Sequence, residues 1–341
     1  MPDFKPRLSV LLPVYNAEKS IINALESIQS QTFKEFECLV LDDGSTDSTS
    51  AKVVEFISND DRFQLISLPH NGIAHTLNTG INLSKASFLA RMDADDISYP
   101  TRFEKQYALL TSNPEFDLVS SLVEFGGDKI SAGGYARYVD WINSLITYND
   151  ILHNQFIESP IAHPSVMMRA ESIKKVGGYR AGDFPEDYEL WLRLLAAGIK
   201  MIKVPEKLLL WADPPERLSR IDARYRKGAF YETKATYLKN WLEANNPFFP
   251  KISIWGAGRV TRRRVDFLLN LGIDVEAWID VNPKLIGGTI NGKPIISPDQ
   301  ISEPNKTFIV SFVSSKGARS KIETFLKDNG YILGHHYICA A

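Results

Sequence analysis

Short apolar runs alternate with amphipathic stretches along the first hundred residues. Four short, mainly apolar runs predict strands: 8–15, 36–43, 63–69 and 86–92, the first two of them buried. The stretches between them space apolar residues by three or four positions, as Ile21, Leu25 and Ile28 do, and so predict helices. This alternation predicts an α/β fold, in which helices cover both faces of a mostly parallel sheet.

A second pattern of the same kind begins near residue 250. The segment Asn245-Asn246-Pro247 and Pro250 interrupt the preceding helical pattern. Beyond them, KISIWGAGRV predicts a strand, a turn and a helix, and DVEAWID at 274–280 predicts a further strand. We therefore expect two domains, a larger one at 1–245 and a smaller α/β domain at 250–341.

Acidic residues gather where the predicted strands end. Asp42 and Asp43 close the second apolar run, and Asp93, Asp95 and Asp96 follow the fourth. The carboxyl ends of parallel strands lie at one edge of a sheet, and ligands bind beyond that edge. This convergence favours a binding site.

The acids after residue 92 have the spacing of a metal site. On an extended chain, Asp93 and Asp95 point the same way. Paired carboxylates suit Mg²⁺ or Mn²⁺, which would cancel their repulsion and stabilise a departing diphosphate. A solvated acidic turn is the alternative interpretation, because aspartate is common in turns.

Composition excludes several classes of protein. The chain is 44% hydrophobic and 23% charged with a formal net charge of -2, which indicates a soluble globular protein that does not bind nucleic acid. Its two cysteines, Cys38 and Cys339, argue against a disulfide framework or a zinc site. The sequence lacks a signal-peptide pattern and an apolar run of about 18 residues. We therefore expect a cytoplasmic protein. If it contacts a membrane, we expect that contact at the inner face.

Several spaced segments, in order over roughly residues 7–210, resemble family 2 glycosyltransferases of the GT-A fold. The segments are SVLLPVYNAEKSIINALESIQSQTFKEFECLVLDDGSTDST, NGIAHTLNTGI, ASFLARMDADDIS, HPSVMMRAESIKKVGGYR and PEDYELWLRLLAAG. The resemblance implies an inverting, metal-dependent transfer of a sugar from a nucleotide-sugar, which we expect to be a UDP-sugar. It also implies a glycan or lipid-linked saccharide as acceptor and a place in surface polysaccharide biosynthesis.

The resemblance assigns the nucleotide end of the site residue by residue. Pro13 and Tyr15 of LPVYN would border the base. Asp43 of LDDGS would accept a hydrogen bond from uracil, with Asp42 packed behind it.

The resemblance also assigns the reacting end of the site. Asp95 would be the main metal ligand, and Asp93 the second acid, near the ribose or the metal. Asp96 would hold the loop or contact the sugar. Asp187 of PEDYELW would be the catalytic base, and Glu186 would orient the acceptor or the loop. Taken alone, these two acids would rather cap the helix that begins there, but the resemblance reverses that preference.

The sequence leaves the roles of two other features of this region open. His163 fits either a place near the acceptor or a hydrogen-bonded place in the core. The segment LLLWADPPERLSR departs from the family pattern, so no diphosphate role follows for Arg217 or Arg220.

The start of the second domain resembles a Rossmann-type nucleotide-binding unit. Gly256 and Gly258 fit its tight turn, and Asp280 follows Gly258 by 22 positions (280 − 258), about where a ribose-binding acid belongs. Thr261 stands in place of the third glycine and puts dinucleotide binding in doubt.

The helix after this turn is unusually basic, and Arg262 is the residue that we expect to bind an anion. The cluster comprises Arg259, Arg262, Arg263 and Arg264. Positive charge opposes the dipole at a helix start. Together with the glycine turn and Asp280, the cluster predicts a phosphate site or a peripheral contact with an acidic membrane, with a solvated basic face as the alternative.

Three other functions fit the sequence less well. A nucleotidyltransferase would need a glycine-rich basic loop after the first strand, where this chain has PVYNAEKS. A non-catalytic nucleotide-sugar-binding or scaffold protein would not need both the DxD acids and Asp187. An NAD-dependent oxidoreductase is disfavoured by Thr261.

Overall fold

The computed structural model describes residues 5–128, 132–214, 217, 220, 222–315 and 317–341. Two compact units share the chain, the first formed by Met1–Ile151 with Pro160–Asp222, and the second by Leu152–Ser159 with Ala223–Ala341. This division differs from the boundary at 245–250 expected from the sequence. The break at 246–250 ends a helix and begins a strand, but both of these elements belong to the second unit.

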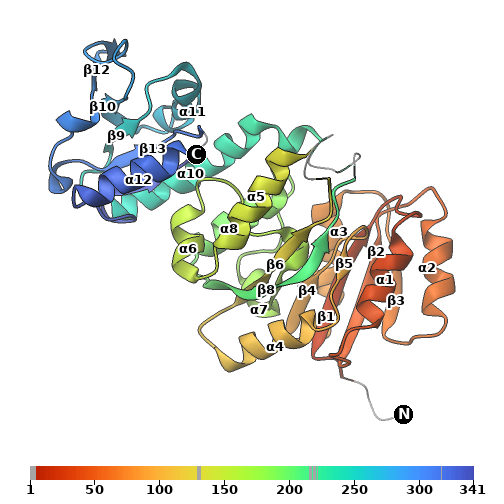
Figure 1. The fold of residues 1–341 in the computed structure, drawn as a ribbon. Coiled ribbons are helices and arrows are strands. Elements are labelled where there is room, and N and C mark those ends of the chain that lie inside the picture. Colours follow the sequence, from red (N-terminus) through yellow and green to blue (C-terminus); the bar gives the residue numbers. More distant parts are fainter. Residues whose placement is uncertain (1–4, 129–131, 215–216, 218–219, 221, 316) are drawn as a thin grey trace. The chain divides into compact units, whose positions relative to one another are not determined.

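The first unit contains an eight-stranded mixed sheet (Figure 1). Its strands are β1 (Leu8–Val14), β2 (Phe36–Asp42), β3 (Phe63–Ser67), β4 (Phe88–Arg91), β5 (Ile97–Ser98), β6 (Leu118–Phe125), β7 (Met167–Arg169) and β8 (Met201–Trp211), in the order β3-β2-β1-β4-β7-β6-β8-β5. The first four strands are parallel, as the sequence predicts, whereas β7 is antiparallel to both β4 and β6. Strand β8 runs parallel to β6 and antiparallel to β5. The predicted α/β class is confirmed.

Helices cover this sheet. They are α1 (Ile21–Gln29), α2 (Thr49–Ile57), α3 (Ile73–Leu83), α4 (Arg102–Ser112), α5 (Gly133–Ser144), α7 (Ala170–Lys175) and α8 (Glu186–Ala196), while α6 (Tyr148–Asn154) runs from the first unit into the second. Ile21, Leu25 and Ile28 of α1 are fully buried in one core cluster with Leu8 and Val10 of β1. Complete burial of each such side chain stabilises the fold by roughly 1.5–3 kcal/mol before entropy is counted.

Helix α3 packs unusually close to the sheet. A Cβ atom added to its Gly80 would lie 2.5 Å from a methyl carbon of Leu41 and 3.0 Å from one of Leu11. The absence of a side chain at residue 80 therefore allows α3 to approach β1 and β2.

The second unit has its own six-stranded sheet. Its strands are β9 (Lys251–Trp255), β10 (Asp274–Ile279), β11 (Thr289–Ile290), β12 (Lys293–Ile296), β13 (Ile309–Ser311) and β14 (Tyr337–Cys339), in the order β11-β12-β10-β9-β13-β14. Its helices include α10 (Lys227–Asn245), α11 (Arg259–Leu269) and α12 (Ala318–Asp328). All neighbouring strands are parallel except β11 and β12, as expected for an α/β unit with helical connections.

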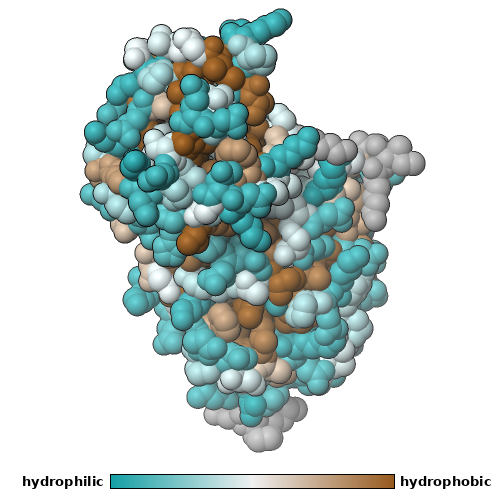
Figure 2. Space-filling model, turned by 60° about the vertical axis from the view of Figure 1, so that its left-hand side comes forward, coloured by the Kyte–Doolittle hydropathy of each residue, from teal (hydrophilic) through white to brown (hydrophobic). Residues whose placement is uncertain are grey.

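The surface gives no sign of a membrane-spanning element in the described part of the chain. None of the helices there is both long and apolar enough to cross a bilayer. On the face shown in Figure 2, hydrophilic and hydrophobic residues are interspersed.

Candidate active site

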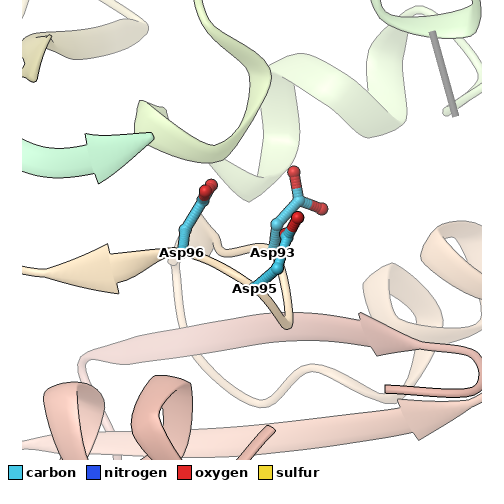
Figure 3. A group of neighbouring side chains, drawn as sticks. All are labelled: Asp93, Asp95 and Asp96. Atoms are coloured by element: carbon cyan, nitrogen blue, oxygen red, sulfur yellow. The ribbon is translucent and has the colours of Figure 1, made fainter. Parts of the chain in front are cut away.

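The three aspartates predicted to form a metal site lie together on the loop after β4. One carboxylate oxygen from each of Asp93, Asp95 and Asp96 lies within 4.8 Å of the others. The three side chains point to the same side of the loop (Figure 3). Asp93 and Asp95 are partly exposed, whereas Asp96 is buried.

A buried arginine neutralises part of this negative charge. Arg91, at the end of β4, is 4% exposed, and its Nη1 forms an ion pair with Asp93 Oδ2. The sequence interpretation missed this residue. The signal was present, because residues two apart on an extended chain point the same way, which places Arg91 beside Asp93.

Repulsion remains within the cluster despite this ion pair. Burial and the charge of Asp93 raise the pKa of Asp95 to about 6. The pKa of Asp96 is raised well above its usual value, by burial first and then by its two acidic neighbours. Holding these carboxylates together therefore costs free energy, and a bound cation would reduce that cost.

Asp96 has a structural role within the loop. Its Oδ1 accepts a hydrogen bond from the backbone N–H of Ala212, which follows β8 (2.8 Å). Its Oδ2 is buried and has no hydrogen-bond partner among the described residues. The donor set, all carboxylate oxygen with one oxygen unsatisfied, fits a hard divalent cation, with Asp95 and Asp93 as the accessible ligands.

Asp187 lies in the first turn of α8, as predicted. Burial and the charge of the adjacent Glu186 raise its pKa to about 7, although the backbone N–H of Tyr188 and the charge of Arg91 act in the opposite direction. The dipole at a helix start favours the ionised carboxylate, but burial outweighs that effect. Glu186 itself is buried, at 3% exposure.

The glycine turn before α8 is held from two sides. Gly177 and Gly178 have positive φ angles of 85° and 73°. Arg193 of α8 donates to the carbonyl oxygen of Gly178 (2.8 Å), and the side-chain amide of Asn78 in α3 exchanges two hydrogen bonds with the backbone of Tyr179 (2.8 and 2.9 Å). These contacts link the helix that carries Asp187 to the helix packed on β1 and β2.

The two acids at the end of β2 both have partners within the protein. Asp42 accepts hydrogen bonds from the backbone N–H of Ser45 (2.9 Å) and from the hydroxyl of Ser50. Asp43 accepts from the backbone N–H groups of Asn71 (2.9 Å) and Gly72 (3.0 Å). Asp43 therefore shapes the loop before α3, and its predicted contact with uracil would be an additional role.

An aromatic stack lies beside these acids. Tyr15 is 47% exposed, and its ring stacks on the imidazole of His70 with 4.2 Å between centroids. The Nδ1 atom of His70 lies 2.9 Å from Asp43 Oδ2. His70 was not among the predicted site residues, although it stands in the turn that follows the third predicted strand. Pro13 is partly buried in β1.

Arg217 is a second cation near the aspartates. Its guanidinium lies over the rings of Trp211 (4.2 Å) and Tyr135 (4.6 Å). It lowers the pKa of Asp95 and Asp96, so it is close enough to act on both carboxylates. Arg220 is farther along the chain and forms an ion pair with Asp213 (2.6 Å).

His163 belongs to the core. Its Nε2 lies 2.7 Å from the hydroxyl oxygen of Tyr179, and its ring packs edge-on against Trp191. Burial lowers the pKa of His163 well below its usual value, which keeps the ring neutral. Of the two roles left open by the sequence, the structure supports the hydrogen-bonded core histidine.

The residues predicted to bind an anion in the second unit are only partly brought together. Asp280 accepts hydrogen bonds from the backbone N–H groups of Ala257 (2.7 Å) and Asn282 (2.8 Å), so it holds the glycine turn closed. Gly256 and Gly258 belong to that turn, with Gly256 at φ 112°. Arg262 lies instead on the side of α11, where it lines a hollow with other residues.

Comparison with known proteins identifies the class to which this fold and site belong. The family described as "Glycosyl transferase family 2" matches residues 9–177. A "UDP-Gal:alpha-D-GlcNAc-diphosphoundecaprenol beta-1,3-galactosyltransferase" of Escherichia coli is 31% identical over 247 residues, which cover 70% of this chain and 84% of that protein. An uncharacterized glycosyltransferase of Haemophilus influenzae is 33% identical over 210 residues, covering 60% of this chain and 64% of its own length.

Solved structures share the fold. TarS (residues 1–349) of S. aureus, in complex with UDP-GlcNAc, superposes with a TM-score of 0.54 and 17% identity, covering 77% of this chain and 71% of that chain. The mannosyltransferase PcManGT of Pyrobaculum calidifontis, in complex with GDP-Man and Mn²⁺, gives a TM-score of 0.50 with 20% identity, covering 71% and 65%.

The protein is a glycosyltransferase with a GT-A-like α/β fold. It belongs to glycosyl transferase family 2.

Proposed function

We propose that the chain transfers a sugar, with inversion, from a UDP-sugar to a hydroxyl group of a glycan or lipid-linked saccharide during surface polysaccharide synthesis. The observation that carries this proposal is a pair of acidic sites in the first unit, which we call acidic centres. One contains Asp93, and the other contains Asp187. Arg91 forms an ion pair with Asp93 at one centre and lowers the pKa of Asp187 at the other, so the two centres lie within electrostatic range of one residue. An inverting transfer needs both, one to receive the acceptor's proton and one to hold the leaving group.

Asp187 is the proposed general base. A carboxylate with a pKa of about 7 is a far better proton acceptor than one with an ordinary pKa near 4, and it is still about half ionised at neutral pH. Glu186 raises this pKa and thereby tunes the base. The acceptor hydroxyl loses its proton to Asp187 as its oxygen attacks the anomeric carbon, and the bond from that carbon to the donor's diphosphate oxygen breaks, so that UDP leaves.

Asp95 and Asp93 are proposed to hold Mg²⁺ or Mn²⁺, which when bound supplies positive charge to the donor diphosphate. The Mn²⁺ in the PcManGT structure supports a divalent cation in this class of site. Arg217, held by stacking on Trp211 and Tyr135, is oriented to add a fixed positive charge there.

The uracil is proposed to lie at the end of β1 and β2, near Pro13, the Tyr15–His70 stack and Asp43. The names of two similar proteins support a UDP-sugar, since one uses UDP-Gal and the other was solved with UDP-GlcNAc. The E. coli relative's diphosphoundecaprenol substrate supports a lipid-linked acceptor and action at the inner face of a membrane.

The second unit is proposed to be a Rossmann-like domain without a dinucleotide. Its parallel strand order and glycine turn support the fold assignment. The hydrogen bonds that Asp280 makes to the backbone, and Thr261 buried in place of a glycine, support the absence of a dinucleotide site.

The test of the proposed function is the exchange Asp187→Asn, with Asp183→Asn as control. Asparagine keeps the shape of the side chain but does not accept a proton, so turnover with a saccharide acceptor should fall at least ~100-fold, while donor affinity stays unchanged. Asp183 is exposed on the loop just before α8, and its exchange should leave turnover within about twofold. Normal turnover by Asp187→Asn would refute the assignment of the base. A wild-type chain that binds donors but never transfers sugar would favour the non-catalytic alternative.

A further inference from the structure

A basic hollow lies in the second unit, on one side of α11. It is lined by Arg259, Arg262, Arg263, Asp266, Leu269, Trp278, Ile290 and Asn291, and it has a volume of about 350 Å³. The α11 residues follow the three- and four-residue spacing of one helix face. Trp278 comes from β10, and Ile290 and Asn291 come from the end of β11 and the turn that follows it.

The cluster of arginines noted in the sequence divides here. Arg264 does not line the hollow, because its guanidinium lies over the ring of Tyr231 (4.7 Å) and donates to the hydroxyl of Ser314 (2.8 Å). Arg259, Arg262 and Arg263 are exposed along the hollow. Three of the four arginines in the cluster therefore face the hollow.

The charge of the hollow is not balanced within the protein. In the part of the chain that the structure describes, no carboxylate lies within ion-pair distance of Arg259, Arg262 or Arg263. One carboxylate, Asp266, lines the hollow one turn farther along α11, so the lining carries a formal charge of +2 (3 − 1). Arginines near the start of a helix also oppose its dipole. An anion here would therefore reduce both the repulsion between the arginines and their unfavourable interaction with the dipole.

A buried tryptophan also lines the hollow. Trp278 is 2% exposed, and its indole Nε1 has no hydrogen-bond partner among the described residues. A buried N–H group without an acceptor is costly, and tryptophan can only donate from this atom. Because this N–H is closed off from solvent, the donors exposed along the hollow are the three guanidinium groups.

We propose that this hollow binds a phosphate ester. Guanidinium groups match phosphate oxygens in pairs. Leu269 and Ile290 provide apolar walls for the carbon portion of the ligand. A soluble sugar or nucleotide phosphate and the headgroup of an anionic phospholipid both carry this chemistry. The site is separate from the proposed donor site and does not depend on it.

The test uses the full chain and two probes. Inorganic pyrophosphate is titrated calorimetrically at low ionic strength with EDTA present, which prevents metal-assisted binding at the acidic loop. Vesicles of phosphatidylcholine, with and without one quarter phosphatidylglycerol, are used in a sedimentation assay. We expect the wild type to bind at least one anionic probe in a salt-sensitive manner.

Arg262→Ser with Arg263→Ser should weaken that binding at least about tenfold, because paired charge-assisted hydrogen bonds are lost. The matched control is Lys321→Ser with Lys327→Ser, which removes the same charge from exposed positions of α12 and should change binding by less than about twofold.

The outcomes distinguish the sources of the phosphate. Loss of pyrophosphate binding in the arginine variant alone supports a soluble ligand, and loss of vesicle binding in that variant alone supports a lipid headgroup. Equal losses in the arginine and lysine variants would show only nonspecific attraction and overturn the proposal. Binding retained by the arginine variant, or binding of neither probe by the wild type, would also overturn it.

Discussion

Asp187 occupies a position in which two electrostatic effects compete. The first turn of a helix stabilises a carboxylate by about 0.3–1 kcal/mol, which alone would lower its pKa. Burial and the neighbouring Glu186 prevail and raise the pKa to about 7. The side chain is thereby poised to gain and lose a proton near neutral pH.

The pH dependence of transfer should follow from this raised pKa. Asp187 accepts a proton only when it is ionised, so kcat should rise with pH through about 7 and level off above it. Glu186→Gln removes a neighbouring negative charge, which should lower the pKa of Asp187 and move the acidic limb to lower pH. Initial rates between pH 5 and 9 would check both expectations. A limb near pH 4 in the wild type would contradict the role of burial.

Asp95 should determine metal-dependent donor binding. Asp95→Asn removes one charge from the accessible pair of ligands, so affinity for UDP with Mn²⁺ present should fall by about tenfold or more, towards the value measured in EDTA. Asp61→Asn, at an exposed position outside the acidic loop, is the control and should bind UDP normally. Wild-type affinity that is the same with Mn²⁺ and with EDTA would exclude the metal role.

At the scale of the element, the close contact between α3 and the sheet predicts a sensitive position. Gly80→Ala places a carbon 2.5 Å from Leu41, so the packing must shift, and the free energy of unfolding should fall by about 1–3 kcal/mol. Urea denaturation of both variants would measure this. Gly228→Ala in α10, where a Cβ meets nothing within 4 Å, is the control and should be neutral or stabilising by up to about 1 kcal/mol. Equal effects at the two sites would contradict the packing argument.

Elements of this fold were predictable where the signal is local. The apolar runs gave β1 to β4 within about two residues, because a short, mainly apolar run between turn signals is a local signature of a strand in a covered sheet. The antiparallel insertion of β7 between β4 and β6 was not predictable, because strand order depends on contacts between distant segments.

The candidate site was predictable only in part, because it too depends on contacts between distant segments. Adjacent acids such as Asp93 and Asp95 were visible in the sequence, but the stacking of Tyr15 on His70 joins residues 55 positions apart (70 − 15).

At the scale of the whole molecule, one lysine joins the separate segments of the second unit. Lys234 of α10 is 3% exposed, and its Nζ donates to the carbonyl oxygens of Phe156 (2.7 Å), Ile157 (3.0 Å) and Ala340 (2.9 Å). Lys234→Met would leave three carbonyl groups without this donor, so the second unit should lose about 2–4 kcal/mol of stability. Its unfolding in urea, followed by tryptophan fluorescence, is the measurement.

The control for this exchange is Lys239→Met on the same helix. Lys239 forms an exposed ion pair with Glu243 (2.8 Å), which contributes at most about 1 kcal/mol. If both methionine variants unfold at the same urea concentration as the wild type, Lys234 is not what holds the segments together.

The second unit is built from two separate stretches of chain, and this has a consequence for protein synthesis. Ala340 leaves the ribosome 183 residues after Ile157 (340 − 157), which takes roughly 10–40 seconds at about 5–20 residues per second. During that interval the first unit can complete its sheet, but the ring of Phe156 has no partner until Trp241 is made, and Trp241 in turn packs against Phe308. The nascent chain must therefore carry an apolar segment in water while the remainder of its unit is translated, and this segment is where a chaperone would be expected to bind.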